Sequence, residues 1–376
     1  MAVITIKTLR SMGIDVQLET LEDPDMALIT DAYGEGLELG IKKIVKLDPF
    51  RGNEGGIYDL TINTHGDMLP YFRKDFTKKN SIVYCHYPAG SCLNRGDPAY
   101  HDTIRKLGLT HFSIESADKY FTKLTNAYRE MMLNSMVLTN SEFSRKAIFN
   151  EFGVDSTVVH PPVDVETFRN ASLWSDIRDD SILVVSRFHP SKKLENAIHL
   201  ARLLKRKGIG KCVKIAGNIN PNDAAYYRYL KNLVRRYGLQ DFIMFEVNVN
   251  FGRLLDLMRR TKVYFHPMPG EPFGISTVEA MSAGLVPVVP DTGGHTEFVP
   301  KKYRFHTIKQ AAEAVAAALS ATSSERLQIS YSTQKYSSAN YTTRFSQIVA
   351  EVLDIGKPAR PAPAILTSEQ MTRSGR

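Results

Sequence analysis

The densest set of residue types suited to chemistry lies between residues 266 and 299, in the stretch HPMPGEPFGISTVEAMSAGLVPVVPDTGGHTEFV. A strand is predicted to end at His266, a turn rich in proline and glycine follows, and a helix is predicted from near Ile275 to a stop at Gly284. The main-chain N–H groups of Phe273, Gly274 and Ile275 would then lie at a helix N-terminus, where unpaired donors and the helix dipole favour a phosphate. The stretch therefore predicts an anion-binding turn.

Two carboxylates accompany this turn. Glu271 stands just before it and Glu279 lies one turn inside the predicted helix, so both side chains can line one pocket. Carboxylates are good acceptors for neighbouring hydroxyl groups, which suits a sugar at one end and a ribose at the other. A nucleoside diphosphate sugar carries both, with phosphates between them. Taken singly, each glutamate is equally well explained as part of a capping turn or as a solvated surface residue.

Two basic residues follow another predicted strand, residues 182–185. Arg187 and Lys192 would lie at the carboxyl edge of the sheet, where open α/β sheets bind their ligands, and could hold a diphosphate. Gly217 and Asn218 follow the strand at 213–216, on the same edge, where a glycine lets the backbone approach a ligand. The alternative for the two basic residues is a pair of solvated loop charges.

The elements that must position these residues are short β-branched runs alternating with helical stretches. One series lies at residues 14–18, 60–62, 82–85, 137–139 and 158–160, and a second at 182–185, 213–216, 242–245, 263–265 and 286–289. This alternation predicts an α/β protein with two Rossmann-like doubly wound domains facing across a cleft. The predicted divisions are 1–160, 161–334, a helix within 335–355 that returns to the first domain, and a disordered tail at 356–376.

The chain starts differently from an ordinary doubly wound domain. Residues 2–12 read as an amphipathic helix stopped at Gly13, where a first strand and a glycine-rich turn are expected. The N-terminal domain is therefore predicted to lack its first strand.

Composition narrows the classes of function. The 376 residues carry a formal net charge of +8, which favours anionic partners, but no base-reading module for nucleic acid is recognisable. No apolar run reaches the roughly 18–20 residues of a membrane helix, so a cytoplasmic or peripheral protein is expected. A basic and aromatic segment at residues 71–76 could meet an anionic bilayer. Three cysteines without a CxxC pair, Cys85, Cys92 and Cys212, are predicted to be buried or free thiols.

In order and spacing, these motifs resemble the retaining glycosyltransferases of the GT-B fold, in the family (group 1, family 4) that includes mannosyl- and glucosyltransferases. The matching features are the E-x7-E pair with its PFG turn, the spaced Arg187 and Lys192, and the Gly293-Gly294 loop with Glu297. The resemblance implies that Glu271 binds hydroxyls of the transferred sugar and Glu279 the ribose. It also implies that Arg187 and Lys192 hold the diphosphate, and that no catalytic metal or protein nucleophile is needed.

The resemblance extends to the N-terminal half, which would hold a glycan or lipid-linked acceptor. Tyr84-Cys85-His86-Tyr87-Pro88 ends a strand and resembles the corresponding segment of the family's mannosyltransferases. It implies that His86 faces the transferred sugar and that the donor is GDP-mannose, with a UDP-sugar as the other possibility. From the residues alone, a histidine in this place is more often structural.

Two other functions compete with this interpretation. Asp23-Pro24-Asp25 could be the paired carboxylates of a metal-dependent transferase of another fold, although a surface turn explains them as well. A non-catalytic module that binds nucleotide sugar or glycan is the second alternative, because the first strand and its glycine-rich loop are missing.

Overall fold

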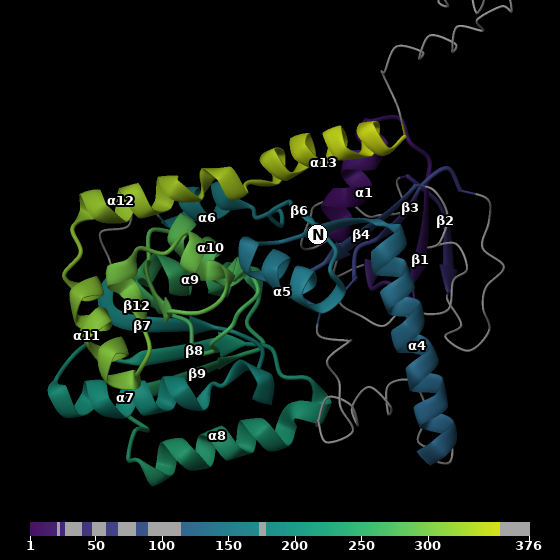
Figure 1. The fold of residues 1–376 in the computed structure, drawn as a ribbon. Coiled ribbons are helices and arrows are strands. Elements are labelled where there is room, and N and C mark those ends of the chain that lie inside the picture. The colour runs from purple at the N-terminus through teal and green to yellow at the C-terminus, as the bar shows by residue number, and fades with distance from the viewer. Residues whose placement is uncertain are drawn as a thin grey trace, which may run out of the picture.

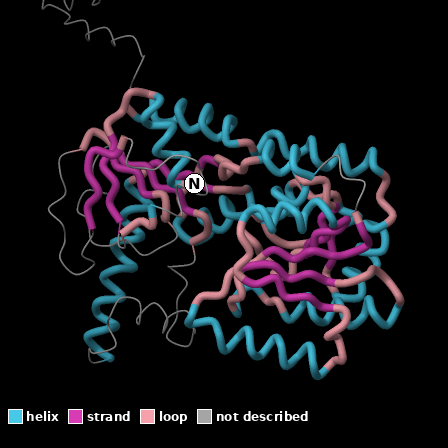
Figure 2. Tube along the Cα trace, turned by 180° about the vertical axis from the view of Figure 1, so that it is seen from behind, coloured by secondary structure: helices cyan, strands magenta, loops and turns pink. Residues whose placement is uncertain are grey.

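The computed structural model describes residues 1–20, 23–26, 40–46, 58–66, 80–88, 114–172 and 178–353. Two groups of strands lie at opposite sides of the molecule, and helices pack around them (Figures 1 and 2). One group belongs to the N-terminal part of the chain and the other to residues after 178. Parallel strands joined by helices form both groups, so the predicted α/β class is confirmed.

The larger sheet has six parallel strands. They are β7 (Asp179–Val185), β8 (Val213–Gly217), β9 (Ile243–Val247), β10 (Thr261–Phe265), β11 (Val286–Pro290) and β12 (Arg304–Phe305). Their spatial order, β9-β8-β7-β10-β11-β12, is that of a doubly wound Rossmann sheet. The five strands of the second predicted series are all present, and β12, a strand of two residues, was not predicted.

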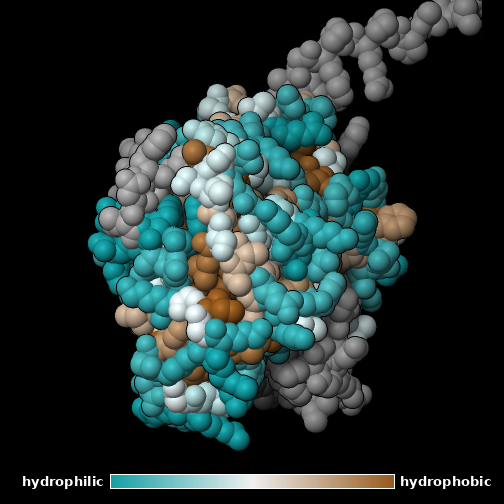
Figure 3. All heavy atoms as spheres, turned by 90° about the vertical axis from the view of Figure 1, so that its left-hand side faces the viewer, coloured by the Kyte–Doolittle hydropathy of each residue, from teal (hydrophilic) through white to brown (hydrophobic). Residues whose placement is uncertain are grey.

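Helices cover both faces of this sheet. They are α6 (Val165–Ser172), α7 (Glu195–Lys207), α8 (Ala224–Arg236), α9 (Phe251–Arg260), α10 (Ile275–Ser282), α11 (Ile308–Leu319) and α12 (Ser323–Ser332). α7 shows how the sequence specifies them: Ala197, Ala201 and Leu204 recur at helical spacing and are fully buried, and the helix ends at Gly208 with φ 64°. On the face seen in Figure 3, hydrophobic residues form small patches among hydrophilic ones.

The N-terminal strands form two smaller parallel sheets among the described residues. β1 (Val16–Thr20) pairs with β2 (Ile41–Lys46), and the second sheet has the order β3 (Thr61–Asn63), β4 (Ser81–Cys85), β5 (Met136–Thr139), β6 (Thr157–Val158). β4 is buried along its whole length. Helices α4 (Ile114–Asn134) and α5 (Glu142–Phe152) flank β5 in the chain. β2 was not predicted.

The first and last helices of the described chain pack together. α1 (Ala2–Ser11) lies against α13 (Ser338–Val352), and the hydroxyls of Thr5 and Tyr341 are 2.7 Å apart. α12 and α13 follow one another along the top of Figure 1 and span both halves of the molecule. The chain crosses between the halves twice at one place, because Val163 forms a parallel bridge with Ser337.

Several sequence predictions fall outside the described residues: the tail at 356–376, the segment at 71–76 and Cys92. Cys85 and Cys212 are buried, and they are not joined to each other by a disulfide. No helix among the described residues is both long enough and apolar enough to span a membrane.

Candidate functional site

The reversal in strand order of the large sheet lies between β7 and β10. These two strands are neighbours, whereas the chain runs outward from β7 through β8 to β9 and then returns to β10. Crevices at the carboxyl ends of strands on either side of such a reversal are where open α/β sheets bind ligands. Arg187 follows β7 and Glu271 follows β10, so the sheet brings them to the same crevice.

A cavity of about 510 Å³ occupies this crevice. All ten site residues predicted from the sequence line it: His86, Arg187, Lys192, Gly217, Asn218, Glu271, Phe273, Gly274, Ile275 and Glu279. His86, Asn140 and Pro161 precede the first crossing at Val163, so both halves of the molecule contribute to the cavity wall.

The turn between β10 and α10 forms one wall. Gly274 is the N-cap of α10 and has φ 98°, a left-handed conformation that favours glycine. Its carbonyl oxygen accepts from the N–H of Thr277 and of Val278, at 3.0 and 3.1 Å. Ile275, the first residue of α10, is 43% exposed and lies on the cavity wall. First-turn N–H groups have no partner within the helix, so this end of α10 can donate to an anion.

Gly293 and Gly294 pack against the turn between β10 and α10. The N–H of Gly294 donates to the carbonyl oxygen of Glu271 at 2.8 Å, and Gly293 forms a parallel bridge with Glu271. A Cβ at Gly294 would lie 2.0 Å from the carbonyl oxygen of Pro272, so a side chain there would displace the turn. Gly217 serves close packing in the same way, because a Cβ would lie 1.8 Å from the carbonyl oxygen of Ser186.

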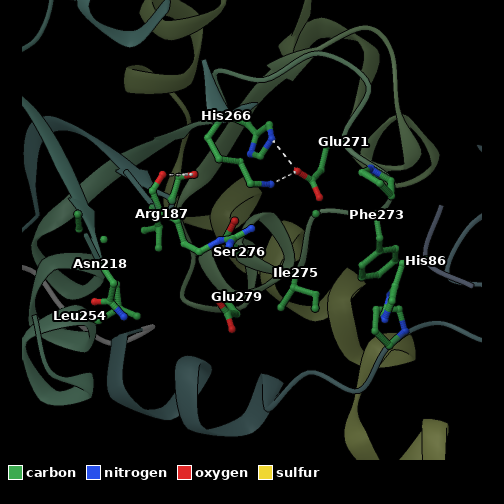
Figure 4. Close-up of a pocket in the computed structure, with 18 of the residues that line it drawn as sticks. His86, Arg187, Asn218, Leu254, His266, Glu271, Phe273, Ile275, Ser276 and Glu279 are labelled. Carbon is green, nitrogen blue, oxygen red and sulfur yellow. Dashed lines mark hydrogen bonds and ion pairs between the residues drawn. The ribbon is translucent and has the colours of Figure 1, made fainter. Parts of the chain in front are cut away.

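Glu271 is the most tightly held carboxylate of the cavity. Its Oε2 lies 3.0 Å from Lys192 Nζ and 3.4 Å from His266 Nε2 (Figure 4). Burial alone would raise the pKa of Glu271, but His266 and Lys192 outweigh it and lower the pKa to about 2. Glu271 is therefore ionised at neutral pH, and both of its oxygens are acceptors for hydroxyl groups.

Glu279 has the opposite environment. It lies away from Glu271, with Ile275 and Ser276 between them in Figure 4, and no described residue forms a hydrogen bond or ion pair with its carboxylate. Burial, with a smaller contribution from the charge of Asp164, raises the pKa of Glu279 to about 7. The carboxylate is thus an acceptor on the cavity wall to which no described residue donates.

Arg187 supplies a positive charge at the cavity wall. Its side chain is exposed, and no hydrogen bond or ion pair to its guanidinium is found among the described residues. Lys192, in contrast, is engaged by Glu271. A diphosphate placed between them would meet one cation that is already oriented and one with its donors available.

The N-terminal half fixes the same turn and places His86 opposite it. Ser141 Oγ donates to the carbonyl oxygen of Pro272 at 2.6 Å, and Ser144 Oγ donates to the carbonyl oxygen of His86 at 2.7 Å. Ser141 is the N-cap of α5 and accepts from the N–H of Ser144, whereas Ser144 is not a cap. The ring of Phe273 is buried and stacks on His160.

His266 and Ser276 line the cavity and were not among the predicted site residues. The sequence did carry a signal for His266, because a histidine that ends a strand at the carboxyl edge stands at the position from which ligand-binding groups project. Ser276 lies next to Ile275 at the start of α10. Neither Asp23 nor Asp25 lines the cavity, and Asp23 pairs with Lys46 at 3.3 Å. Within the described ranges, no group of three or more His, Cys, Asp or Glu side chains is arranged to hold a metal.

The fold and the site define a two-domain α/β protein of the GT-B class. Residues 166–337 match the family described as Glycosyl transferases group 1. The structure is similar to Anabaena Alr3699/HepE in complex with UDP and glucose, with a TM-score of 0.64, 15% identity and coverage of 93% and 94% of the two chains. A glycosyltransferase from Rickettsia africae gives a TM-score of 0.62 at 14% identity, with 94% of both chains covered. The predicted GT-B fold is confirmed.

Curated relatives share one name, GDP-Man:Man(3)GlcNAc(2)-PP-Dol alpha-1,2-mannosyltransferase. The protein from Dictyostelium discoideum is 27% identical over 298 residues, which cover 72% of this chain and 59% of the relative. The human protein is 29% identical over 213 residues, which cover 52% of this chain and 43% of the relative. The chain thus matches about half the length of these relatives.

Proposed function

We propose that the protein is a retaining glycosyltransferase that moves a hexose from a nucleoside diphosphate sugar to a glycan or lipid-linked acceptor. One arrangement carries this proposal: Glu271 and Glu279 line a single cavity on either side of Ile275 and Ser276, and Arg187, Lys192 and the N-terminus of α10 line the same cavity. This order of groups matches the sugar, diphosphate and ribose of such a donor.

Each group then has a defined task. Glu279 accepts from the ribose hydroxyls, and Glu271 accepts from hydroxyls of the sugar to be transferred. Arg187 and Lys192, with the main-chain N–H groups of Gly274 and Ile275, bind the diphosphate. When the glycosidic bond to the nucleotide breaks, negative charge grows on the departing phosphate oxygen, and these donors stabilise it without moving.

The acceptor attacks from the side of the N-terminal half, where His86 faces the cavity. In a retaining transfer the acceptor oxygen arrives on the face from which the nucleotide departs, so the new bond keeps the anomeric configuration. No protein nucleophile is assigned, because the carboxylate nearest the sugar, Glu271, is already paired with Lys192. The two cations and the helix end take the electrostatic role that a metal ion fills in other transferases.

GDP-mannose is the proposed donor and a lipid-linked glycan the proposed acceptor. The names of the curated relatives support both, and the resemblance of residues 84–88 to the mannosyltransferases of the family agrees with them. A UDP-sugar is the other candidate, because several similar structures contain UDP. A net charge of +8 would favour peripheral contact with an anionic bilayer, and we place the protein at the cytoplasmic face.

The test is nucleotide release from GDP-mannose, UDP-glucose and UDP-N-acetylglucosamine, measured with and without a lipid-linked glycan. Release that requires both one donor and the acceptor, and that is lost in Glu271→Ala, supports the proposal. A non-catalytic module would bind a donor and release nothing. The relatives, which are named as transferases, favour the enzyme over that module.

A further inference from the structure

A line of polar contacts leads away from Glu271 beneath the anion-binding turn. Ser276 Oγ lies 2.8 Å from the hydroxyl of Tyr264, that hydroxyl lies 3.1 Å from His266 Nδ1, and His266 Nε2 lies 3.4 Å from Glu271 Oε2. Tyr264 is fully buried and His266 is 3% exposed. Both side chains belong to the end of β10, two residues apart, and therefore project to the same side of the strand.

The direction of these contacts follows from the negative charge at one end. Glu271 is ionised, so the ring nitrogen that faces it must carry a proton to be stable there. With the proton on Nε2, the neutral ring accepts at Nδ1 from the Tyr264 hydroxyl, which in turn accepts from Ser276. A ring protonated on both nitrogens would also present Nε2–H to Glu271, so both states give the same contact.

No other described group competes for His266 Nε2. The atom is buried and has no hydrogen-bond partner, and its 3.4 Å contact with Glu271 is at ion-pair distance. The neighbouring His295 differs: its Nε2 lies 2.9 Å from the carbonyl oxygen of Pro290, a contact that serves only the fold. His266 Nε2 thus faces a residue of the cavity, whereas His295 Nε2 contacts main chain.

Both partners of Glu271 take the same oxygen. Lys192 Nζ and His266 Nε2 meet at Oε2, and no described residue bonds Oε1 (Figure 4). A carboxylate held through one oxygen cannot rotate freely about its last bond, so its other oxygen is presented in a fixed direction. A sugar hydroxyl that donates to Oε1 would meet an acceptor that is already aligned.

We propose that His266 is a positioning residue that, with Lys192, holds Oε2 of Glu271 and reserves Oε1 for a hydroxyl of the donor sugar. Tyr264 and Ser276 fix the proton of His266 on the nitrogen that faces Glu271. This inference rests on the proposed function, and it adds a residue that acts through Glu271 and not on the nucleotide.

The test compares the affinity for GDP-mannose with that for GDP by calorimetry, together with transfer kinetics. His266→Leu keeps an apolar volume but no donor, and we expect kcat/KM to fall roughly 10- to 100-fold while the affinity for GDP stays within about twofold. His266→Gln carries an amide N–H near the place of Nε2 and should recover part of the loss. Combined with Glu271→Ala, His266→Leu should cause no further loss, because both changes remove one function.

Tyr264→Phe is a second test in case His266→Leu fails to fold, because it deletes only one hydroxyl. Like His266→Leu, it should reduce the preference for GDP-mannose over GDP. Tyr303→Phe is the matched control, because it deletes a hydroxyl that binds Glu325 away from the cavity. If His266→Leu and Tyr264→Phe both keep the preference for GDP-mannose over GDP, the role of His266 is wrong while the proposed function stands. The same holds if the losses in kcat/KM caused by His266→Leu and Glu271→Ala add fully in the double variant. If the unaltered protein prefers none of the nucleotide sugars tested over its nucleotide, the proposed function is wrong and the inference falls with it.

Discussion

Ser141, the N-cap residue of helix α5, donates a hydrogen bond to the carbonyl oxygen of Pro272, 131 residues further along the chain. The N-terminal half is therefore hydrogen-bonded directly to the anion-binding turn of the C-terminal half. A second contact lies beside it, because Glu297 Oε1 accepts from the N–H of Phe143 at 3.0 Å. The start of one helix is thus completed by groups from the other half of the molecule.

Ser141→Ala should lower the free energy of unfolding by about 1 kcal/mol through loss of the cap and should also weaken donor binding, because the turn loses its support. Urea unfolding and calorimetry measure the two effects. Ser337→Ala is the matched control, since Ser337 caps α13 in the same way without touching the turn. Equal donor affinity in the two variants would contradict this role of Ser141.

Glu271→Ala should reduce transfer by roughly 10²- to 10³-fold while nucleotide affinity changes comparatively little, because the carboxylate contacts the sugar and not the nucleotide. The comparison requires initial rates of transfer and binding of the nucleotide alone. Glu313→Ala, on the exposed face of α11, is the control for removing a glutamate. Loss of nucleotide and sugar binding in equal measure would count against the assigned task.

Lys192→Ala should slow turnover by about 10²-fold, because the charge that grows on the departing nucleotide loses a donor held in place. Single-turnover experiments at saturating donor isolate this step from binding. Lys207→Ala removes an exposed lysine at the end of α7 and should leave the rate unchanged. Unaltered turnover in Lys192→Ala would remove this residue from the site.

Gly294→Ala should destabilise the turn, because the added Cβ would lie 2.0 Å from the carbonyl oxygen of Pro272. We expect a loss of about 1–3 kcal/mol of stability, with reduced donor affinity. Gly252→Ala is the contrasting case, since that glycine lies in α9 and a Cβ there meets nothing closer than 3.7 Å. Thermal unfolding of both variants decides the point, and similar midpoints would refute the clash.

The free energy of unfolding should depend on pH through the ionisation of Glu279. Its pKa is raised from 4.5 to about 7, so the folded protein retains a proton that the unfolded chain has released. The cost of ionising Glu279 in the fold is therefore absent below about pH 4.5 and complete above about pH 7. Glu279→Gln should gain stability relative to the unaltered protein as the pH rises through this window, and a difference that does not vary with pH would contradict the assignment.

The same group predicts proton release on nucleotide binding. Ribose hydroxyls that donate to Glu279 favour its ionised form, so binding near pH 6.5 should release protons from the site. Calorimetry in two buffers of different ionisation enthalpy measures this release. It should diminish in Glu279→Gln, and an unchanged release would place its source elsewhere.

The large sheet and its cavity were predictable because each rests on local sequence. Every strand of the second series is a short β-branched run followed by turn residues, and the doubly wound order gathers the turns at one edge. β2 was missed because its sequence, IKKIVK, contains three lysines and does not alternate between apolar and polar residues, and most of the strand is exposed. β12 is too short to leave a pattern.

Contacts between distant segments were beyond the reach of the sequence. The bond from Ser141 to Pro272 depends on how the halves meet, and no periodicity records that. The role of Glu271 was predicted from residue type and spacing, whereas its contacts with Lys192 and His266 were not predicted. Lys192 was predicted only as a ligand of the diphosphate, and its ion pair with Glu271 was not foreseen. His266 was predicted only as the end of a strand, and its contact with Glu271 was not foreseen either.

The two passages of the chain between the halves run side by side, since Val163 donates to the carbonyl oxygen of Tyr336 and accepts from the N–H of Ser338. The two connections between the halves are therefore joined to each other by main-chain hydrogen bonds. A rotation of one half against the other about this point would leave α13 packed on α1, but it would have to break the hydrogen bonds from Ser141 to Pro272 and from Phe143 to Glu297.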